Sequence, residues 1–219
     1  MRGPRSEPGA RRVIEARRAP LRSLALAAGA GYLAGTLPSA AMAARMATGG
    51  AIDLRVAGSA NPGAANAIAV LGSGWGYAVL AADIGKGAGA CWYGRRVAGG
   101  HGAHLAGAAA VVGHCFPVWS GFRGGKGVAA SVGQCLVTFP VWFPVDLAVA
   151  LATASRRVRH RAFAATAVSS LAWVVGGAVW WRRKLPNLWG PEPTWALPAA
   201  SAASAAVIMY KFAAAEAGR

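Results

Sequence analysis

The chain has 219 residues, of which 55% are hydrophobic and only 14% are charged, and its formal net charge is +16. This composition excludes an ordinary soluble domain of the same length, because the surface of such a domain needs far more polar residues. The basic residues form short groups between apolar runs, which argues against a nucleic-acid partner and favours anionic lipid head groups and a phosphorylated substrate. We therefore expect an all-α fold, a polytopic membrane helix bundle with about seven transmembrane helices.

The chain begins with a basic segment, residues 1–22, that contains seven arginines among Pro, Ala and Gly. We expect a disordered tail that leads into an uncleaved first helix, and a cleaved signal peptide is the alternative. The apolar run 23–44 is long enough to span a bilayer, which takes about 20 residues. Pro38 predicts a kink in this run that frees backbone carbonyls for a neighbouring segment. Ser39 either bends the helix through its hydroxyl or contacts a ligand.

Residues 45–66 contain the first candidate ligand site. The loop 58–63 has the small residues of a turn, and a helix is predicted to start at Ala64. A helix start behind such a loop is an anion site, and Arg55 is close enough in the sequence to add a bidentate grip on phosphate. The alternative is that the polar residues of the loop only cap the helix. The candidate phosphate ligands of this stretch are Arg55, Ser59, Asn61, Gly63 and Asn66.

The long apolar run 67–93 is interrupted by Asp83 and Lys86. Residues three positions apart share one face of a helix, so the two side chains can form an ion pair, which is how charged groups survive at membrane depth. Because ionisable residues inside a membrane are functional more often than not, both are candidate site residues. A purely structural ion pair is the alternative.

A polar link at 95–102 and an apolar helix at 103–119 lead to the second candidate site. His114 is either a substrate ligand or a hydrogen-bonded structural group. In the loop that follows, two basic side chains supply charge, and glycines let the backbone take positive φ and approach a ligand closely. This is the chemistry of an anion cradle, and a solvated loop between membrane helices is the alternative. The candidate residues of the loop are Arg123, Gly124, Gly125, Lys126 and Gly127.

The run 128–155 is apolar but contains Pro140 and Pro144 near its middle. Each half is short for a full crossing at 1.5 Å per residue, so two short tilted helices are plausible, and a single kinked helix is the competing interpretation. The bundle has about seven spans in the first case and six in the second.

Two further spans are predicted at 162–181 and 195–215, and an arginine-rich cluster at 156–161 precedes the first of them. The predicted organisation is a single integral-membrane domain at 23–215 with a short tail at 216–219. Lys and Arg are divided nearly equally between the two sets of loops, so the positive-inside rule does not determine the orientation. The three cysteines form no metal-binding pattern, and we expect neither a metal nor a cofactor.

Taken together, several of these stretches resemble the bacterial membrane glycerol-3-phosphate acyltransferases that use acyl phosphate as donor, the PlsY family. Order and spacing match from about Gly31 to Gly133, and the combination is specific although each piece alone is weak. The matching segments are GYLAGTLPS at 31–39, DLRVAGSANPGAAN at 53–66, DIGKG at 83–87, GHCFPV at 113–118 and GFRGGKGVAA at 121–130.

The resemblance implies a seven-helix protein of the bacterial plasma membrane whose substrate loops face the cytoplasm. It also implies transfer of a fatty acyl group from acyl phosphate to the 1-hydroxyl of glycerol 3-phosphate, which forms 1-acylglycerol 3-phosphate (lysophosphatidic acid) for phospholipid synthesis. Lys126, Ser59 and Arg55 are the implied catalytic residues. The implied partners are the two substrates, anionic membrane lipids and the soluble enzyme that makes acyl phosphate. The implied substrate- and phosphate-binding residues are Ser39, Asn61, Gly63, Asn66, Asp83, Lys86, His114, Arg123, Gly124, Gly125 and Gly127.

The C-terminal region departs from the family pattern. Members usually end with a basic motif of the form R-H-x-x-N-I followed by Glu, whereas this chain reads IMYKFAAAE at 208–216. The His and Asn are missing, and Tyr210 and Ala213 stand near their places. The departure supports an alternative function: a catalytically impaired homologue that binds or transports a phosphorylated lipid precursor.

Overall fold

The computed structural model describes residues 19–155 and 161–217, and in these ranges every regular element is a helix. Residues 1–18 of the predicted tail and most of the predicted arginine cluster lie outside the described residues. In chain order the elements are α1 (Leu21–Gly35), α2 (Ser39–Thr48), α3 (Ala64–Leu71), α4 (Ser73–Cys115), the 3₁₀ helix η1 (Val118–Ser120), α5 (Val128–Thr138), α6 (Phe143–Ala154), α7 (Arg161–Arg183) and α8 (Ala196–Ala217).

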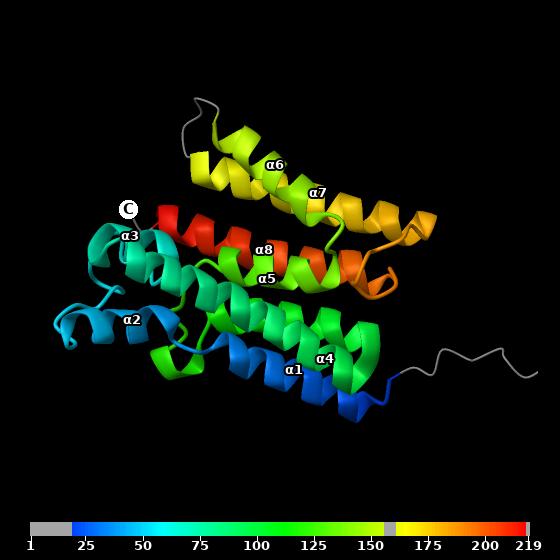
Figure 1. Ribbon diagram of the computed structural model, residues 1–219, viewed down its shortest axis with the longest axis horizontal. Helices are drawn as coiled ribbons and strands as arrows, with labels where there is room; N and C mark the ends of the chain where they lie inside the picture. The colour runs from blue at the N-terminus through cyan, green and yellow to red at the C-terminus, as the bar shows by residue number, and fades with distance from the viewer. Residues whose placement is uncertain (1–18, 156–160, 218–219) are drawn as a thin grey trace, which may run out of the picture.

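The long helices lie side by side in an elongated bundle (Figure 1). α1, α4 and α5 pack together on one side, α6 and α7 pack together on the other, and α8 lies between the two groups and contacts both. The short helices α2 and α3 extend from one end and pack on α4. This arrangement agrees with the all-α bundle expected from the sequence.

Within the described ranges, three helical segments are long and apolar enough to cross a membrane: Leu21–Thr48, Arg161–Arg183 and Ala196–Glu216. α5 and α6 are apolar but have only 11 and 12 residues. At 1.5 Å per residue they are about 16–18 Å long, which is short for a hydrocarbon core of about 30 Å. α5 ends before Pro140 and Pro144 lies in the first turn of α6. The prolines therefore separate two short helices, and the single kinked helix is not observed.

α4 consists of two helical arms that fold back on each other. Ala98 (φ −140°, ψ 24°) and Gly99 (φ 64°, ψ −154°) are not helical, and glycine takes such a positive φ without strain. Gly94 and Gly102 pack so closely across the hairpin that a Cβ on either one would clash with the backbone of the other. The polar link expected at 95–102 is therefore wrong, because the two arms continue as helix up to this tight turn.

Small residues set the distance between α4 and its neighbours. Gly31 and Gly35 of α1 contact the backbone of the second arm of α4, and Gly87 of the first arm contacts the backbone of Ala130 in α5. A Cβ at any of these three glycines would clash with backbone atoms. Close approach through small residues is the packing that membrane helices favour. It places α1 and α5 directly against the two arms of α4.

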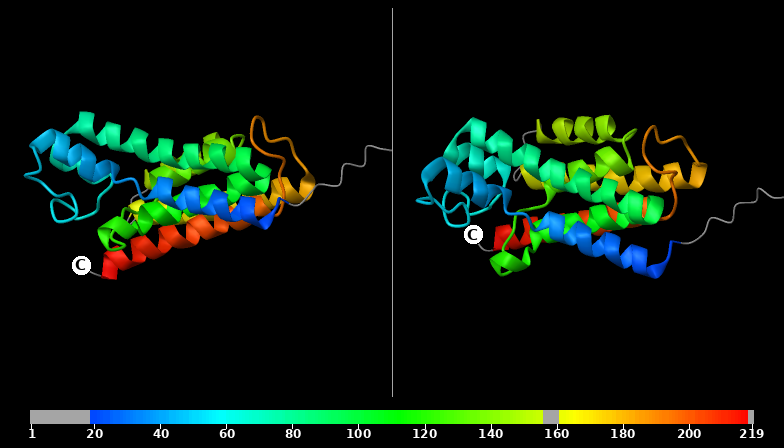
Figure 2. Two further views of the ribbon diagram at one scale, coloured as in Figure 1. Left: turned by 90° about the horizontal axis from the view of Figure 1, so that it is seen from below. Right: turned by 60° about the horizontal axis from the view of Figure 1, so that its bottom comes forward.

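Three connecting segments meet at one end of the bundle: 36–38, 49–63 and 116–127. Both views in Figure 2 place the last two at the end where α8 terminates, opposite the start of α1. The hydroxyl of Tyr32 donates a hydrogen bond to the carbonyl oxygen of Phe116 at 2.9 Å. The indole nitrogen of Trp119 donates to Thr36 Oγ1 at 3.0 Å. These bonds attach the segment 116–127 to the end of α1.

Candidate active site

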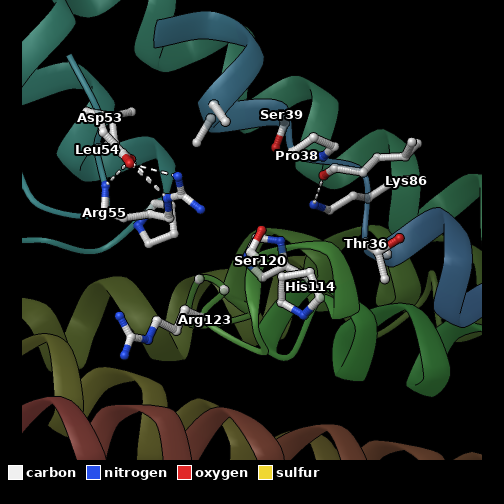
Figure 3. Close-up of a pocket in the computed structure, with 18 residues that line it drawn as sticks. Thr36, Pro38, Ser39, Asp53, Leu54, Arg55, Lys86, His114, Ser120 and Arg123 are labelled. Atoms are coloured by element: carbon white, nitrogen blue, oxygen red, sulfur yellow. Dashed lines mark hydrogen bonds and ion pairs between the residues drawn. The ribbon is translucent and has the colours of Figure 1, made fainter. Parts of the chain in front are cut away.

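A cavity of about 470 Å³ lies where these segments meet, and Figure 3 shows the side chains that line it. It brings together the two glycine-rich stretches that the sequence singles out, although they are far apart in the chain. The side chains of Lys86 and His114 come from the two arms of α4. The lining segments and residues are 35–41, 53–55, Pro62, Lys86, His114, Pro117, Ser120 and 123–125.

Asp83 and Lys86 form the ion pair expected from their spacing. Lys86 Nζ lies 2.9 Å from Asp83 Oδ1, and both side chains are at most 5% exposed. Ser39 Oγ donates a hydrogen bond to the same carboxylate oxygen at 2.5 Å. Lys86 Nζ also donates to the carbonyl oxygen of Leu37 at 3.2 Å, so the kink at Pro38 does present a carbonyl to a neighbouring segment. Mutual pairing and added hydrogen bonds offset the cost of burying the two charges.

The glycines of the second stretch are required by their contact with His114. A Cβ at Gly124 would clash with the carbonyl oxygen of His114, and a Cβ at Gly125 would clash with its imidazole ring. The amide of Gly124 donates to the carbonyl oxygen of Cys115 at 3.2 Å. His114 Nδ1 in turn lies 3.6 Å from Asp83 Oδ1. The loop therefore passes directly over the imidazole, and the imidazole faces the buried ion pair.

Arg55 and Arg123 line the opposite side of the cavity from Lys86 (Figure 3). The guanidinium of Arg55 binds the carboxylate of Asp53 through Nε at 3.0 Å to both oxygens and through Nη2 at 2.8 Å. The hydrogen bonds from Arg55 hold the pKa of Asp53 below its usual value, and the same pairing raises the pKa of Arg55. Asp53 is therefore ionised at neutral pH. Its pairing with Arg55 is lost only as the pH falls through this lowered pKa.

Asn66 is a buried structural residue of the loop between α2 and α3. Its Oδ1 accepts a hydrogen bond from the amide of Ser59 at 2.8 Å. Its Nδ2 donates to the carbonyl oxygens of Leu54 at 3.1 Å and Ala57 at 3.0 Å. The N-cap of α3 is Gly63, and no side chain hydrogen-bonds the start of this helix. The capping role considered for Ser59 and Asn61 is therefore not observed, and Asn66 instead closes the loop that carries Arg55.

Replacing Asn66 with alanine is expected to lower the free energy of unfolding by about 2–3 kcal/mol, because three hydrogen bonds to buried or half-buried backbone groups are lost together. The loop should also open, so any contact of Arg55 with a substrate should weaken and KM should rise. Thermal denaturation and steady-state kinetics of the purified variant measure the two effects. Asn61→Ala, in the same loop but half-buried, is the matched control and should change stability by less than about 0.5 kcal/mol. Equal effects of both variants would contradict the role assigned to Asn66.

Lys126 lies outside this cavity. Its ammonium group is 4.0 Å from the ring centroid of Phe212 in α8. It lines a separate cavity with Arg161, Phe163, Phe212, Ala215 and Glu216, among others. Gly124 and Gly125, which precede Lys126, line the first cavity, and Gly127, which follows it, is the N-cap of α5. The side chain of Lys126 points away from the first cavity and toward α8.

The cavity thus collects part of the predicted site. Asp83 lies directly behind it, bonded to two residues of its wall. Leu37 and Ser120 also line the cavity but were not predicted as site residues. The predicted kink at Pro38 indicates that the carbonyl of Leu37 is free, whereas no feature of the sequence indicates Ser120. The predicted residues that line the cavity are Ser39, Arg55, Lys86, His114, Arg123, Gly124 and Gly125. The predicted residues that do not line it are Ser59, Asn61, Gly63, Asn66, Asp83, Lys126 and Gly127.

Two solved structures share this fold. Both are crystal structures of PlsY, an integral membrane glycerol 3-phosphate acyltransferase, one in the glycerol 3-phosphate form and one in the lysophosphatidic acid form. The first is 26% identical to this chain, with a TM-score of 0.68 over 88% of this chain and 89% of PlsY. The second is 25% identical, with a TM-score of 0.66 over 86% and 87% of the two chains.

Similarity in sequence leads to the same group of proteins. The glycerol-3-phosphate acyltransferase of Gloeobacter violaceus is 42% identical over 168 residues, which cover 72% of this chain and 77% of the relative. The glycerol-3-phosphate acyltransferase of Desulforudis audaxviator is 38% identical over 157 residues, which cover 71% and 78%. The model of the glycerol-3-phosphate acyltransferase family matches residues 25–215. The chain therefore belongs to the glycerol-3-phosphate acyltransferase family.

Proposed function

We propose that this protein transfers a fatty acyl group from acyl phosphate to the 1-hydroxyl of glycerol 3-phosphate and so forms 1-acylglycerol 3-phosphate. The reaction takes place in the bacterial plasma membrane, with the cavity open to the cytoplasm. The observation that carries the proposal is the placement of three cationic side chains around one cavity, at the end of a membrane helix bundle. These are Arg55, Lys86 and Arg123. Membership of the family supplies the reaction class.

The proposed reaction requires the protein mainly to position the two substrates and to neutralise their charges. The oxygen of the 1-hydroxyl attacks the carbonyl carbon of acyl phosphate, and the bond from that carbon to the phosphate oxygen breaks. The hydroxyl proton passes to phosphate, which leaves as the second product. Because phosphate is already a good leaving group, holding the two substrates together and neutralising their negative charges supplies much of the rate enhancement.

Lys86 and the two arginines are suited to different parts of this task. An ammonium group has three N–H donors, and Lys86 uses two of them on Asp83 and Leu37. The third remains for a substrate oxygen in the cavity. The guanidinium groups of Arg55 and Arg123 can each hold two oxygens of one phosphate. Ser59 and Lys126 contribute through the position of their loops and not through direct contact with the reacting groups.

The proposal is tested with the full chain purified in lipid nanodiscs, with palmitoyl phosphate as donor and glycerol 3-phosphate as acceptor. Formation of 1-palmitoylglycerol 3-phosphate and inorganic phosphate in equal amounts is expected. Turnover only with palmitoyl coenzyme A would contradict the donor assignment. Binding of glycerol 3-phosphate without turnover from either donor would contradict the enzymatic proposal and favour the role as a binding or transport protein.

The two lysines should differ in this assay. Lys86→Met is expected to lower kcat/KM by about 100-fold or more, because a cation that faces the cavity is removed. Lys126→Met is expected to lower it by about tenfold or less, because this ammonium packs on Phe212 in α8. Size-exclusion chromatography of both variants separates loss of activity from loss of fold. A greater loss in Lys126→Met than in Lys86→Met would place Lys126 at the reacting groups and contradict this assignment.

A further inference from the structure

The end of the bundle opposite the candidate active site is rich in arginine and tryptophan, and the proposed reaction uses none of these residues. It comprises the start of α1, the turn of α4, the end of α7 and the link 184–195 that leads to α8. Figure 1 and both views in Figure 2 place these segments together, away from the end where α8 terminates. These four segments form the distal end of the molecule.

Direct contacts hold the segments of the distal end together. Arg95, beside the turn of α4, donates a hydrogen bond from Nη1 to the carbonyl oxygen of Trp189 at 2.6 Å. The indole nitrogen of Trp189 donates in turn to the carbonyl oxygen of Leu136 in α5 at 2.9 Å. The ring centroids of His101 and Trp195 lie 5.8 Å apart. The link that carries both tryptophans is thus attached to the rest of the bundle.

The distal end has a large surplus of positive charge. Six exposed cations stand there, whereas the only carboxylate among the described residues of its four segments is that of Glu192. Within the described parts of the chain, none of the six forms an ion pair with a carboxylate. Such an excess of unpaired positive charge favours an anionic partner. The cations are Arg22, Arg95, Arg96, Arg182, Arg183 and Lys184.

Exposed tryptophans lie among these cations. Trp92, Trp189 and Trp195 are each more than half exposed. The guanidinium of Arg96 lies 3.6 Å from the ring centroid of Trp92. Stacking uses the face of the guanidinium and leaves its N–H groups, which point outward in its plane, for the oxygens of a phosphate. Tryptophan beside arginine is typical of the boundary between lipid and water.

The length of α7 places the distal end at this boundary. α7 has 23 residues, from Arg161 to Arg183, and is about 34 Å long at 1.5 Å per residue. This length matches a hydrocarbon core of about 30 Å. Arg161 lines the cavity of Lys126 at one end of the bundle, and Arg182 and Arg183 form the last turn at the other. The distal cations therefore reach the head groups of the leaflet opposite the active site.

We propose that the distal end binds anionic phospholipid in the leaflet that faces away from the active site. The arginines at the turn of α4 and at the end of α7 bind the phosphate groups, and the exposed tryptophans contact the glycerol backbone and the upper acyl chains. The inference goes beyond the proposed function and does not depend on turnover. It also accounts for the near-equal division of Lys and Arg between the two sets of loops, because the distal cations have lipid phosphate as their partner.

The experiment measures lipid binding to the full chain in detergent by native mass spectrometry. Dioleoyl phosphatidylglycerol is the anionic probe, and dioleoyl phosphatidylcholine is the neutral comparison. The wild type should bind phosphatidylglycerol about tenfold more tightly or better. Arg96→Gln/Arg183→Gln removes one cation from α4 and one from α7, and should lower the affinity for phosphatidylglycerol about tenfold while that for phosphatidylcholine stays within about twofold. Arg96→Lys/Arg183→Lys keeps both charges and should retain most of the affinity.

The charge-matched control is Arg45→Gln/Arg161→Gln. Arg45 in α2 and Arg161 at the start of α7 lie at the other end of the bundle. Their removal should change the affinity for phosphatidylglycerol by less than about twofold. All four arginines of the two double variants are exposed, so both variants should fold and should denature close to the wild-type temperature.

Three other results would overturn the inference. Equal affinity of the wild type for the two lipids would mean that the distal end selects no anion. Equal losses in the two double variants would reduce the lipid preference to the overall charge of the protein. Full competition by glycerophosphoglycerol, the water-soluble head group without acyl chains, would mean that the distal end binds a free phosphodiester and not a membrane lipid.

Discussion

Replacing Asp83 with alanine is expected to lower the free energy of unfolding by about 3–5 kcal/mol, because it leaves the buried ammonium of Lys86 without its carboxylate. Asp83 is 1% exposed, and it also accepts the hydrogen bond of Ser39. Thermal denaturation of the purified protein in a fixed detergent measures the loss. A shift close to zero would mean that the pair is hydrated in the folded protein.

The matched control removes both charges at once. In Asp83→Asn/Lys86→Met the amide oxygen can still accept from Ser39 and no buried charge is left unpaired. This double variant should therefore recover most of the lost stability, since neutral replacements of a buried ion pair are often well tolerated. It should nevertheless be as inactive as Lys86→Met. A stable double variant with wild-type turnover would show that the ion pair is purely structural.

Gly124→Ala is expected to reduce kcat/KM by about 100-fold or more, because a displacement of about 1 Å at the site is enough for such a loss. The new Cβ would clash with the carbonyl oxygen of His114, a backbone atom that cannot rotate away. The loop must therefore lift, and Arg123 lifts with it. Steady-state kinetics with both substrates check this expectation.

Gly89→Ala is the control for this substitution. Gly89 lies in the first arm of α4, and a Cβ there has nothing within 4 Å. Alanine in a helix interior is about 0.5–1 kcal/mol more favourable than glycine, so this variant should be as active as the wild type and slightly more stable. If Gly124→Ala retained wild-type kinetics, close packing on His114 would not be what the loop requires of this glycine.

The features that sequence reasoning predicted well are those set by neighbours along the chain. The pairing of Asp83 with Lys86 follows from a spacing of three on a helix. The break between α5 and α6 follows from Pro140, whose ring and missing amide stop a helix. The kink at Pro38 and the start of α3 behind Gly63 are of the same kind. Each depends on a few adjacent residues and needs no knowledge of the rest of the bundle.

The features that it missed depend on contacts between distant segments. The ammonium group of Lys126 lies over the ring of Phe212, which α8 brings alongside the loop. The structural use of Asn66 depends on how the loop at 54–59 folds back over α3. Polar residues in a small-residue loop look alike in the sequence whether they bind a ligand or the loop itself. Their roles could be separated only once the tertiary structure was known.

The turn at Ala98 and Gly99 sets how the two arms of α4 lie relative to each other. Lys86 on one arm and His114 on the other each lie about 20 Å from this turn, counted along the arm at 1.5 Å per residue. At that distance, a change of about 3° in the angle between the arms would move either residue by about 1 Å. A displacement of this size at a catalytic site is enough to change the reaction rate. The contact of Gly94 with Gly102 fixes the separation of the two arms beside the turn. Packing at the turn therefore helps to set the spacing of Lys86 and His114 at the opposite end of the bundle.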